Sequence, residues 1–305
     1  MVHFDWAEIL KVCPAGSSDS HDLALLAEAL FEAAPVALSY FRRRTKTWMK
    51  PGNTLVGEAD LAVDCFLKEY LLSRRPNYGW LSEEDQTSHG RVERSRNFVV
   101  DPIDGTNAFL SGNDEWVMSV AVVEKHRPVA AALMRPAAEF DVGGNILLSC
   151  QGCTAFSFKL CEQKGALLGN QIKVSDSATV KGSRVSLPRK WYRLDEVQDF
   201  LRRYGLTTSR YIPSLALRLV SVSQGETEFV ISSGEFCDWD IVAADLLIRE
   251  SGGRLATMDG KDICYDTNFP SSESLIVAPL GLLDEALSIF QDLESMVRAR
   301  KSIYR

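Results

Sequence analysis

The sequence predicts a protein of mixed α and β structure, with an α+β first half followed by an α/β second half. Short apolar runs separated by turns between residues 116 and 158 are typical of an antiparallel meander. Beyond residue 183, strand-like and helix-like segments alternate, which is typical of an α/β arrangement. We therefore expect two halves, residues 1–180 and 181–305, joined by the Gly-, Ser- and Lys-rich stretch 165–183.

The first half should begin with two helices. Residues 22–41 carry a helical apolar stripe that Pro35 is expected to kink or interrupt. A second helix should start near Asp60, which would place that carboxylate at a helix N-terminus. The strands of the meander should then follow the apolar runs at residues 116–123, 129–134, 146–149 and 154–158.

The second half should contain three strands and four helices. The helix that follows Asp240 should end at Gly252 and Gly253, which are typical helix stops. We expect strands at 185–187, 227–231 and 275–278, and helices at 195–204, 214–224, 241–250 and 281–300.

The composition limits the partners. The 305 residues are 46% hydrophobic and 25% charged, with a formal net charge of −7, as in an ordinary soluble globular protein. Such an acidic chain disfavours a nucleic-acid polymer or an anionic membrane as partner, although bound cations would still allow a small anionic substrate. No signal peptide or membrane span is visible, and the seven cysteines are an odd number, so we expect a cytoplasmic protein without a disulfide framework. Cys150 and Cys153 are predicted to be buried strand residues and not metal ligands.

Acidic residues stand where elements should end or begin. Asp101 and Asp104 follow the apolar run Phe98-Val99-Val100, and Asp240 precedes a helix. Oxygen ligands of this kind suit Mg²⁺ or Mn²⁺ and not zinc. None of the four histidines lies in these segments, which disfavours a zinc hydrolase or a histidine-activated nucleophile.

Four motifs resemble those of one family. Residues 101–109, DPIDGTNAF, resemble the DPxDGTxxF signature of the inositol monophosphatase superfamily of metal-dependent phosphatases. Residues 239–253, WDIVAADLLIRESGG, are similar to its second signature, Ser82-Glu83-Glu84 to its acidic pair, and residues 55–60 to its V-T-x-A-D segment. The four motifs stand in the family's order across most of the chain.

The resemblance implies a layered αβαβα sandwich of the sugar-phosphatase type, with a metal site at the junction of the two halves. Glu83, Asp101 and the carbonyl of Ile103 resemble ligands of a first Mg²⁺ ion. Asp101, Asp104 and Asp240 resemble ligands of a second. A weaker third site would use Glu83 and Asp60, so two or three Mg²⁺ ions are expected, with Mn²⁺ as a possible substitute.

The resemblance also assigns catalytic and substrate-binding groups. Thr106 with Glu83 would orient a metal-activated water for attack on the phosphate. The backbone N–H groups of Gly105 and Thr106 would hold phosphate oxygens. Arg218 matches a basic position of the 3′(2′),5′-bisphosphate nucleotidases, although it could instead be a surface helix residue. Inhibition by lithium and a homodimer are further expectations from the family.

Several positions depart from the family pattern. Ser233 stands where inositol monophosphatases carry an acid that contacts inositol hydroxyls, and Glu235 would replace that acid only if the loop shifts. Gly57 and Ala59 replace threonines near Asp60, which affects the third metal.

The expected function is hydrolysis of a small phosphate ester. Inositol monophosphate is the first choice and adenosine 3′,5′-bisphosphate the second. Fructose 1,6-bisphosphate comes third, because no extra basic cluster for a second phosphate on a sugar is visible. The alternative from another class is a regulatory or binding protein whose phosphatase activity is incidental.

Overall fold

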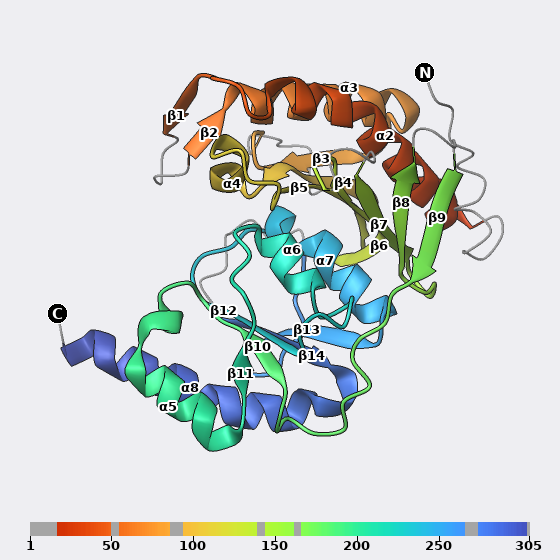
Figure 1. The fold of residues 1–305 in the computed structure, drawn as a ribbon. Coiled ribbons are helices and arrows are strands. Elements are labelled where there is room, and N and C mark those ends of the chain that lie inside the picture. The colour runs from red at the N-terminus through yellow and green to blue at the C-terminus, as the bar shows by residue number, and fades with distance from the viewer. Residues whose placement is uncertain are drawn as a thin grey trace.

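The chain folds into five layers that alternate between helices and sheets (Figure 1). The computed structural model describes residues 17–49, 55–85, 94–138, 144–161, 166–265 and 274–303. A pair of helices covers a seven-stranded sheet, a second pair lies between that sheet and a five-stranded sheet, and a third pair covers the far side. This is the αβαβα sandwich that the family resemblance implies.

The first layer consists of α2 (Ser18–Tyr40) and α3 (Glu58–Arg74), which are joined through the hairpin of β1 (Thr47–Met49) and β2 (Leu55–Gly57). The side chain of Ser17 caps α2 by accepting a hydrogen bond from the Ser20 N–H at 3.1 Å. Pro35 lies exposed inside α2 and does not end it, so the predicted interruption is wrong.

Helix α2 is long and apolar enough to cross a membrane, by length and composition only. Half of its apolar window is buried within the fold, where α2 packs against α3 and the neighbouring sheet. Core helices of globular proteins show the same combination.

The seven-stranded sheet has the order β3-β4-β5-β6-β7-β8-β9. Strand β3 runs parallel to β4 and every later pair is antiparallel, so the predicted meander is confirmed. β9 lies within the stretch predicted to join the two halves, and the sheet therefore extends further along the chain than expected. The strands are β3 (Gly79–Ser82), β4 (Arg96–Asp104), β5 (Val117–Glu124), β6 (Arg127–Arg135), β7 (Asn145–Cys150), β8 (Phe156–Cys161) and β9 (Ala166–Gln171).

Alternation along the strands gives the sheet two apolar faces. Phe98 and Val100 of β4 pack in the core beneath α2 and α3, whereas Val99 packs in the core shared with α7. Because both faces of the sheet are covered, consecutive residues of a strand are buried on opposite sides, and the strands are therefore continuous apolar runs in the sequence.

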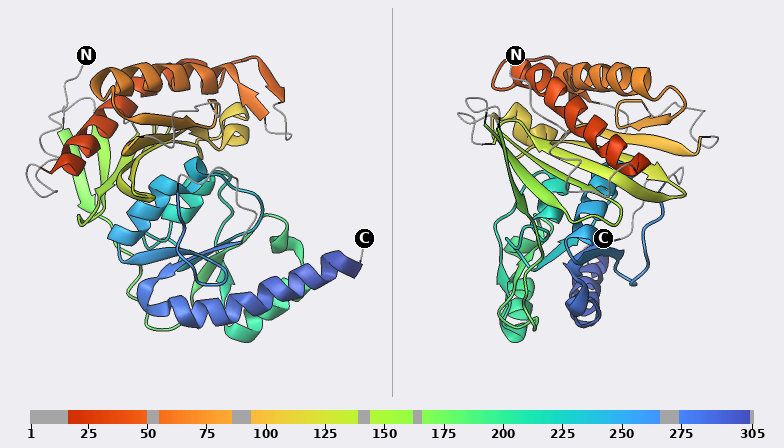
Figure 2. Two further views of the ribbon diagram at one scale, coloured as in Figure 1. Left: turned by 180° about the vertical axis from the view of Figure 1, so that it is seen from behind. Right: turned by 90° about the vertical axis from the view of Figure 1, so that its right-hand side faces the viewer.

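The second sheet has the order β11-β10-β12-β14-β13. Helices α6 (Leu215–Val220) and α7 (Asp238–Glu250) separate it from the first sheet, and α5 (Asp195–Tyr204) and α8 (Leu283–Ile303) cover its outer face (Figure 2). Its strands are β10 (Arg184–Ser186), β11 (Thr207–Thr208), β12 (Phe229–Ser232), β13 (Gly253–Thr257) and β14 (Leu275–Pro279), and the short 3₁₀ turns are η2 (Trp191–Arg193) and η3 (Leu280–Leu282).

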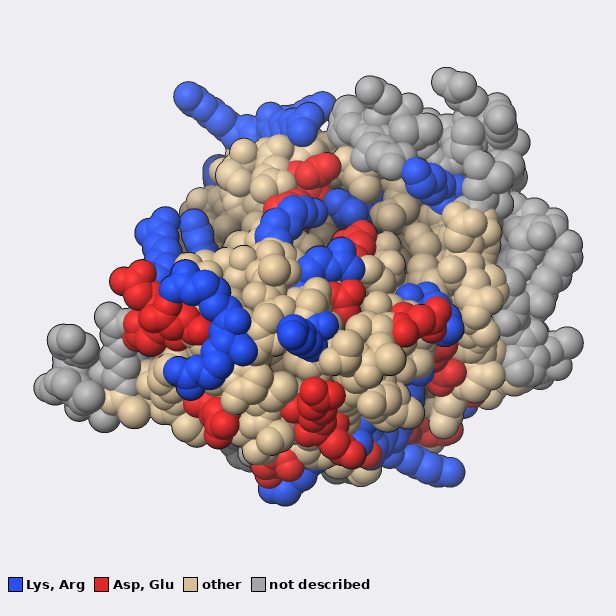
Figure 3. All heavy atoms as spheres, turned by 60° about the horizontal axis from the view of Figure 1, so that its bottom comes forward, with Lys and Arg blue, Asp and Glu red and all other residues tan. Residues whose placement is uncertain are grey.

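The second half differs from expectation in several elements. Strands β11 and β13 were not expected from the sequence, and α6 ends four residues before the predicted 224. Helix α7 begins at Asp238 and not at the predicted residue 241, which places Asp240 in its first turn. The division into two halves at residues 180 and 181 stays a prediction. On the face shown in Figure 3, acidic and basic side chains are interspersed over the surface.

Candidate active site

The end of β4 presents two aspartates in a broken stretch of sheet. Pairing with β5 is regular up to Asp101, then shifts register before Asp104 pairs with Val117. Pro102 lies inside this gap and has no N–H to donate to the ladder. The Asp101 side chain is 1% exposed, and its Oδ1 accepts a hydrogen bond from the Ile103 N–H at 3.0 Å. The irregular register therefore turns both carboxylates out of the normal strand alternation.

Gly105 makes the turn from β4 into α4 (Thr106–Leu110). Its φ of 93° lies in the left-handed region, and an added Cβ would stand 3.0 Å from the Glu115 carbonyl oxygen. Only glycine fits this turn without strain, and the turn brings Thr106 beside the acids.

Asp104 is tied to the start of α6. Its carboxylate accepts hydrogen bonds from the Ser214 hydroxyl and from the N–H groups of Leu215 at 3.2 Å and Ala216 at 2.7 Å. These three partners of Asp104 were not predicted from the sequence. A serine before a short apolar helical run is a cap signal, and Ser214 does cap α6 through the Leu217 N–H at 3.1 Å.

Asp60 and Asp240 occupy equivalent positions at two helix starts. Asp60 Oδ2 accepts the Gly57 N–H at 2.9 Å, and Asp240 Oδ2 accepts the Cys237 N–H at 2.6 Å. Each carboxylate thus reaches back to the residue before its helix, as the third residue of a capping box does. The Thr106 hydroxyl links Asp60 to the β4 end, because Thr106 Oγ1 lies 3.3 Å from Asp60 Oδ1 and 3.2 Å from the Ile103 carbonyl oxygen.

Glu83 follows β3 directly and is half-buried. Its N–H donates to the Val100 carbonyl at 3.2 Å, which continues the pairing with β4. The preceding Ser82 is fixed by a hydrogen bond to buried Asp64, and Ser82 Oγ in turn accepts the Glu84 N–H at 3.1 Å. The backbone thus holds Glu83 next to the aspartates of β4.

Four of the predicted acids act electrostatically on the fifth, Asp101. Burial, followed by the charges of Glu83, Asp104, Asp240 and Asp60, raises the pKa of Asp101 well above its usual value. Burial raises the pKa of Asp240 to about 7, against the opposing hydrogen bond from Cys237. Burial also raises the pKa of Asp60 to about 6, partly offset by the hydrogen bond from Gly57. The structure therefore brings together acids that the sequence places as far apart as residues 60 and 240.

The chemistry of this donor set fits a hard divalent cation. It consists of carboxylate oxygens with a backbone carbonyl nearby, and the repulsion at Asp101 is the kind that a cation relieves. Within the described residues, no three acidic, histidine or cysteine side chains are already placed to hold one ion. Several carboxylates accept backbone N–H groups in this structure, so they would have to turn toward a cation to bind it together.

Arg218 lies inside the fold and not on the surface. The residue is 7% exposed. Its Nη1 donates a hydrogen bond to the Leu187 carbonyl at 3.4 Å, and its Nη2 donates one to Ser232 Oγ at 3.2 Å. The alternative of a surface helix residue is therefore wrong. These two hydrogen bonds connect α6 to the ends of β10 and β12, close to the loop that carries Ser233 and Glu235. Its contact with a substrate stays a prediction.

Cys150 and Cys153 are both buried, as predicted, and their Sγ atoms are 2.9 Å apart. Cys150 is the last residue of β7, whereas Cys153 lies in the turn after it and not in a strand as predicted. No histidine or additional cysteine in the described residues completes a metal site around them.

Comparison with known families decides the classification. The profile of the inositol monophosphatase family matches residues 19–295, which is most of the chain and includes all four motifs. The chain belongs to this family. Among curated members, it is 29% identical over 249 residues to the histidinol-phosphatase of Mycobacterium tuberculosis, covering 79% of this chain and 89% of the relative.

Other family members carry different names. The chain is 30% identical over 213 residues to an inositol-1-monophosphatase of Mesorhizobium japonicum, covering 69% of this chain and 74% of that protein. It is 25% identical over 250 residues to the 3′(2′),5′-bisphosphate nucleotidase CysQ of Aggregatibacter actinomycetemcomitans, covering 81% and 88%. These relatives are phosphatases with different substrates, so the comparison supports phosphatase activity and leaves the substrate open.

Solved structures share the fold. The Thermotoga maritima IMPase superposes with a TM-score of 0.73 at 21% identity, covering 92% of this chain and 99% of that chain. An IMPase/NADP phosphatase complexed with NADP and Ca²⁺ superposes with a TM-score of 0.74 at 18% identity, covering 90% and 97%. The likeness confirms the predicted fold class.

Proposed function

We propose that this inositol monophosphatase family member is a Mg²⁺-dependent phosphomonoesterase that hydrolyses a small phosphate ester. The observation that carries the proposal is the buried acid cluster around Asp101. Burial and neighbouring carboxylates raise the pKa values of Asp60, Asp101 and Asp240, and clusters of acids perturbed in this way are typical of metal-binding and catalytic sites.

The ligand assignments follow the family motifs. Glu83, Asp101 and the Ile103 carbonyl would hold one Mg²⁺ ion, and Asp101, Asp104 and Asp240 a second. Asp60 with Glu83 would serve a third, weaker site. Bound divalent cations would supply positive charge for the phosphate oxygens and the leaving oxygen, and would acidify a water molecule.

The chain's own groups would position the reactants. Glu83 would accept a proton from the attacking water, and the Thr106 hydroxyl would orient that water from its place between Asp60 and the Ile103 carbonyl. The N–H groups of Gly105 and Thr106 would hold phosphate oxygens at the turn that only glycine can make. The rigid turn would thus fix the phosphate relative to Glu83.

Inositol monophosphate is the proposed first substrate, supported by 30% identity to a named inositol-1-monophosphatase. Histidinol phosphate is a second candidate, because a histidinol-phosphatase matches over 79% of the chain. Exposed Glu235 favours testing it, since a free carboxylate after β12 would suit a cationic alcohol. Adenosine 3′,5′-bisphosphate is a further candidate, because a named 3′(2′),5′-bisphosphate nucleotidase matches over 81% of the chain and the buried Nε of Arg218 has no hydrogen-bond partner among the described residues.

One panel assay tests these proposals. Phosphate release should be measured with Mg²⁺ from inositol 1-phosphate, histidinol phosphate, adenosine 3′,5′-bisphosphate and fructose 1,6-bisphosphate. We expect turnover of at least one monoester, with loss of activity in EDTA and recovery with Mg²⁺ or Mn²⁺. No turnover of any member, with Mg²⁺ bound, would favour the regulatory or binding role. A cytoplasmic location and a homodimer remain predictions that cell fractionation and sedimentation would test.

A further inference from the structure

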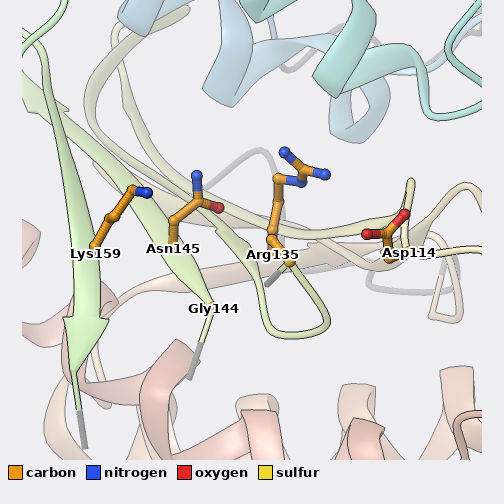
Figure 4. Close-up of a pocket in the computed structure, with 6 residues that line it drawn as sticks. Asp114, Arg135, Gly144, Asn145 and Lys159 are labelled. Atoms are coloured by element: carbon orange, nitrogen blue, oxygen red, sulfur yellow. The ribbon is translucent and has the colours of Figure 1, made fainter. Parts of the chain in front are cut away.

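The turn after β7 brings together two cysteines that the proposed phosphatase reaction does not use. β7 begins at Asn145, which lines the pocket in Figure 4, and ends five residues later at Cys150. The chain then turns and reaches Cys153, whose Sγ lies 2.9 Å from that of Cys150. Both residues are thiols in this structure, and neither belongs to the four family motifs.

The backbone of this turn sets the separation of the two cysteines. The Cys153 N–H donates to the Cys150 carbonyl at 2.9 Å, which closes a β-turn. Gly152 has a φ of 75°, in the left-handed region that the third residue of a type II turn requires. The Cα atoms at the two ends of a β-turn lie within about 7 Å, and those of a disulfide lie about 4.4–6.8 Å apart. The turn therefore holds both cysteines at a separation that a disulfide can bridge.

The two sulfur atoms need little movement to bond. A disulfide bond is about 2.05 Å long, so the two Sγ atoms have to approach by less than about 1 Å. Both side chains pack in the core beneath α2 and α3, where Cys150 is fully buried and Cys153 is 5% exposed. Close packing leaves core side chains few alternative rotamers, so the two thiols stay together in the folded chain.

One of the two thiols can be reached from solvent. Gln151 and Gly152 are exposed, and a Cβ added at Gly152 would meet no atom within 4 Å. Cys153 follows this open part of the turn and is the more exposed of the two cysteines, so a small oxidant reaches its sulfur first. Cys150 lies behind it, in the position of a resolving thiol.

We propose that Cys150 and Cys153 are a peroxide-sensitive oxidation site that closes to a reversible disulfide. The Cys153 thiol attacks one oxygen of hydrogen peroxide and becomes a sulfenic acid, while the other oxygen leaves with the thiol proton as water. The Cys150 thiol then attacks the sulfenic sulfur, the S–S bond forms, and the second oxygen leaves as water. Two thiols and one peroxide thus give one disulfide and two water molecules, and a dithiol reductant restores both thiols.

The disulfide adds a covalent link next to a contact between the sheet and α7. The Gly152 N–H donates to Glu250 Oε1 at 3.0 Å, and Glu250 is the last residue of α7. A link across the turn restricts the unfolded chain, so the oxidised form should be the more stable one. Glu250 lies ten residues after Asp240, or about 15 Å along the helix, so closure leaves the acid cluster in place. The site is therefore independent of the proposed phosphatase reaction.

Mass spectrometry of the peroxide-treated full chain tests the proposal. The folded chain is treated with hydrogen peroxide, quenched, unfolded in the presence of iodoacetamide and digested with trypsin. The tryptic peptide that spans residues 126–159 contains only these two cysteines. We expect this peptide to lack both labels and to be lighter by two hydrogen atoms than the dithiol. Dithiothreitol added before iodoacetamide should restore both labels.

Two variants and a thermal measurement complete the test. Cys153→Ala should keep the label on Cys150, because that thiol is fully buried. Cys264→Ser, which removes an exposed cysteine, should form the disulfide as the parent does. Oxidation should raise the Tm of the parent by about 2–5 °C more than that of Cys153→Ala. Labels retained on both cysteines of the treated parent, a disulfide to a third cysteine, or a lower Tm after oxidation would overturn the proposal.

Discussion

Replacing Asp240 with asparagine should stabilise the metal-free protein while destroying its response to metal. The ordinary pKa of this carboxyl is 3.8, and in the folded protein it is about 7, mainly because of burial. The folded state therefore holds its proton at a pH where the unfolded chain has lost it. The stability that this group contributes is complete below pH 4 and is lost as pH rises through 7.

The size of the effect follows from that difference. About three pKa units correspond to about 4 kcal/mol of unfolding free energy at pH 8. Asp240 is half-buried, so screening by water reduces this value. We therefore expect Asp240→Asn to raise the free energy of unfolding by about 2–3 kcal/mol at pH 8. The asparagine oxygen can still accept the Cys237 N–H that caps α7, so the cap should persist.

Urea unfolding in EDTA at several pH values measures the change. The increase in unfolding free energy caused by Asp240→Asn should be near zero at pH 4, rise up to pH 7 and then level off. Mg²⁺ should reverse the order, since it stabilises the parent by binding the folded state and has little effect on the variant. Asp195→Asn is the matched control, being an exposed acid in the first turn of α5, and should change stability by less than about 0.5 kcal/mol. A variant no more stable than the parent at pH 8 would contradict the raised pKa of Asp240.

Three further predictions concern catalysis. Asp101→Asn should abolish Mg²⁺-dependent phosphate release with an unchanged circular dichroism spectrum; unchanged turnover would contradict its assignment as a shared ligand. Gly105→Ala should lower the unfolding free energy by about 1–2 kcal/mol or more and reduce turnover, because φ is 93° and the new Cβ meets the Glu115 carbonyl. A fully active and fully stable variant would show that the turn does not require glycine. Lithium chloride should inhibit phosphate release at fixed Mg²⁺ when sodium chloride does not, and equal rates in the two salts would count against competition at a metal site.

The parts of the site that are set by local sequence were predictable. Asp101 and Asp104 stand directly after an apolar strand, and Asp60 and Asp240 stand in first helical turns where a side chain can reach back to the cap. The order of strands in the meander was predictable for the same reason, since each hairpin joins neighbouring runs.

The parts that depend on distant contacts were not predictable. Asp104 is bound by the start of α6, 110 residues further along the chain. Arg218 is buried because α6 packs over the ends of β10 and β12, and nothing in its own segment distinguishes that from an exposed helical arginine. Strand β13 was not predicted, because the short segment after Gly252 has too little alternation of apolar and polar residues to indicate a strand. Its strand conformation depends on pairing with β14.

Titration of the metal-free chain with Mn²⁺, followed by electron paramagnetic resonance at pH 7.5, tests whether the acids around Asp101 form a divalent-cation site. We expect at least two bound ions per chain in the parent, with loss of binding in Asp101→Asn and displacement by Mg²⁺. Binding should be weaker at pH 5, because the raised pKa values of Asp60 and Asp240 make protons compete with the metal. No bound Mn²⁺ in the parent, or equal binding by Asp101→Asn, would contradict a cation site at these acids.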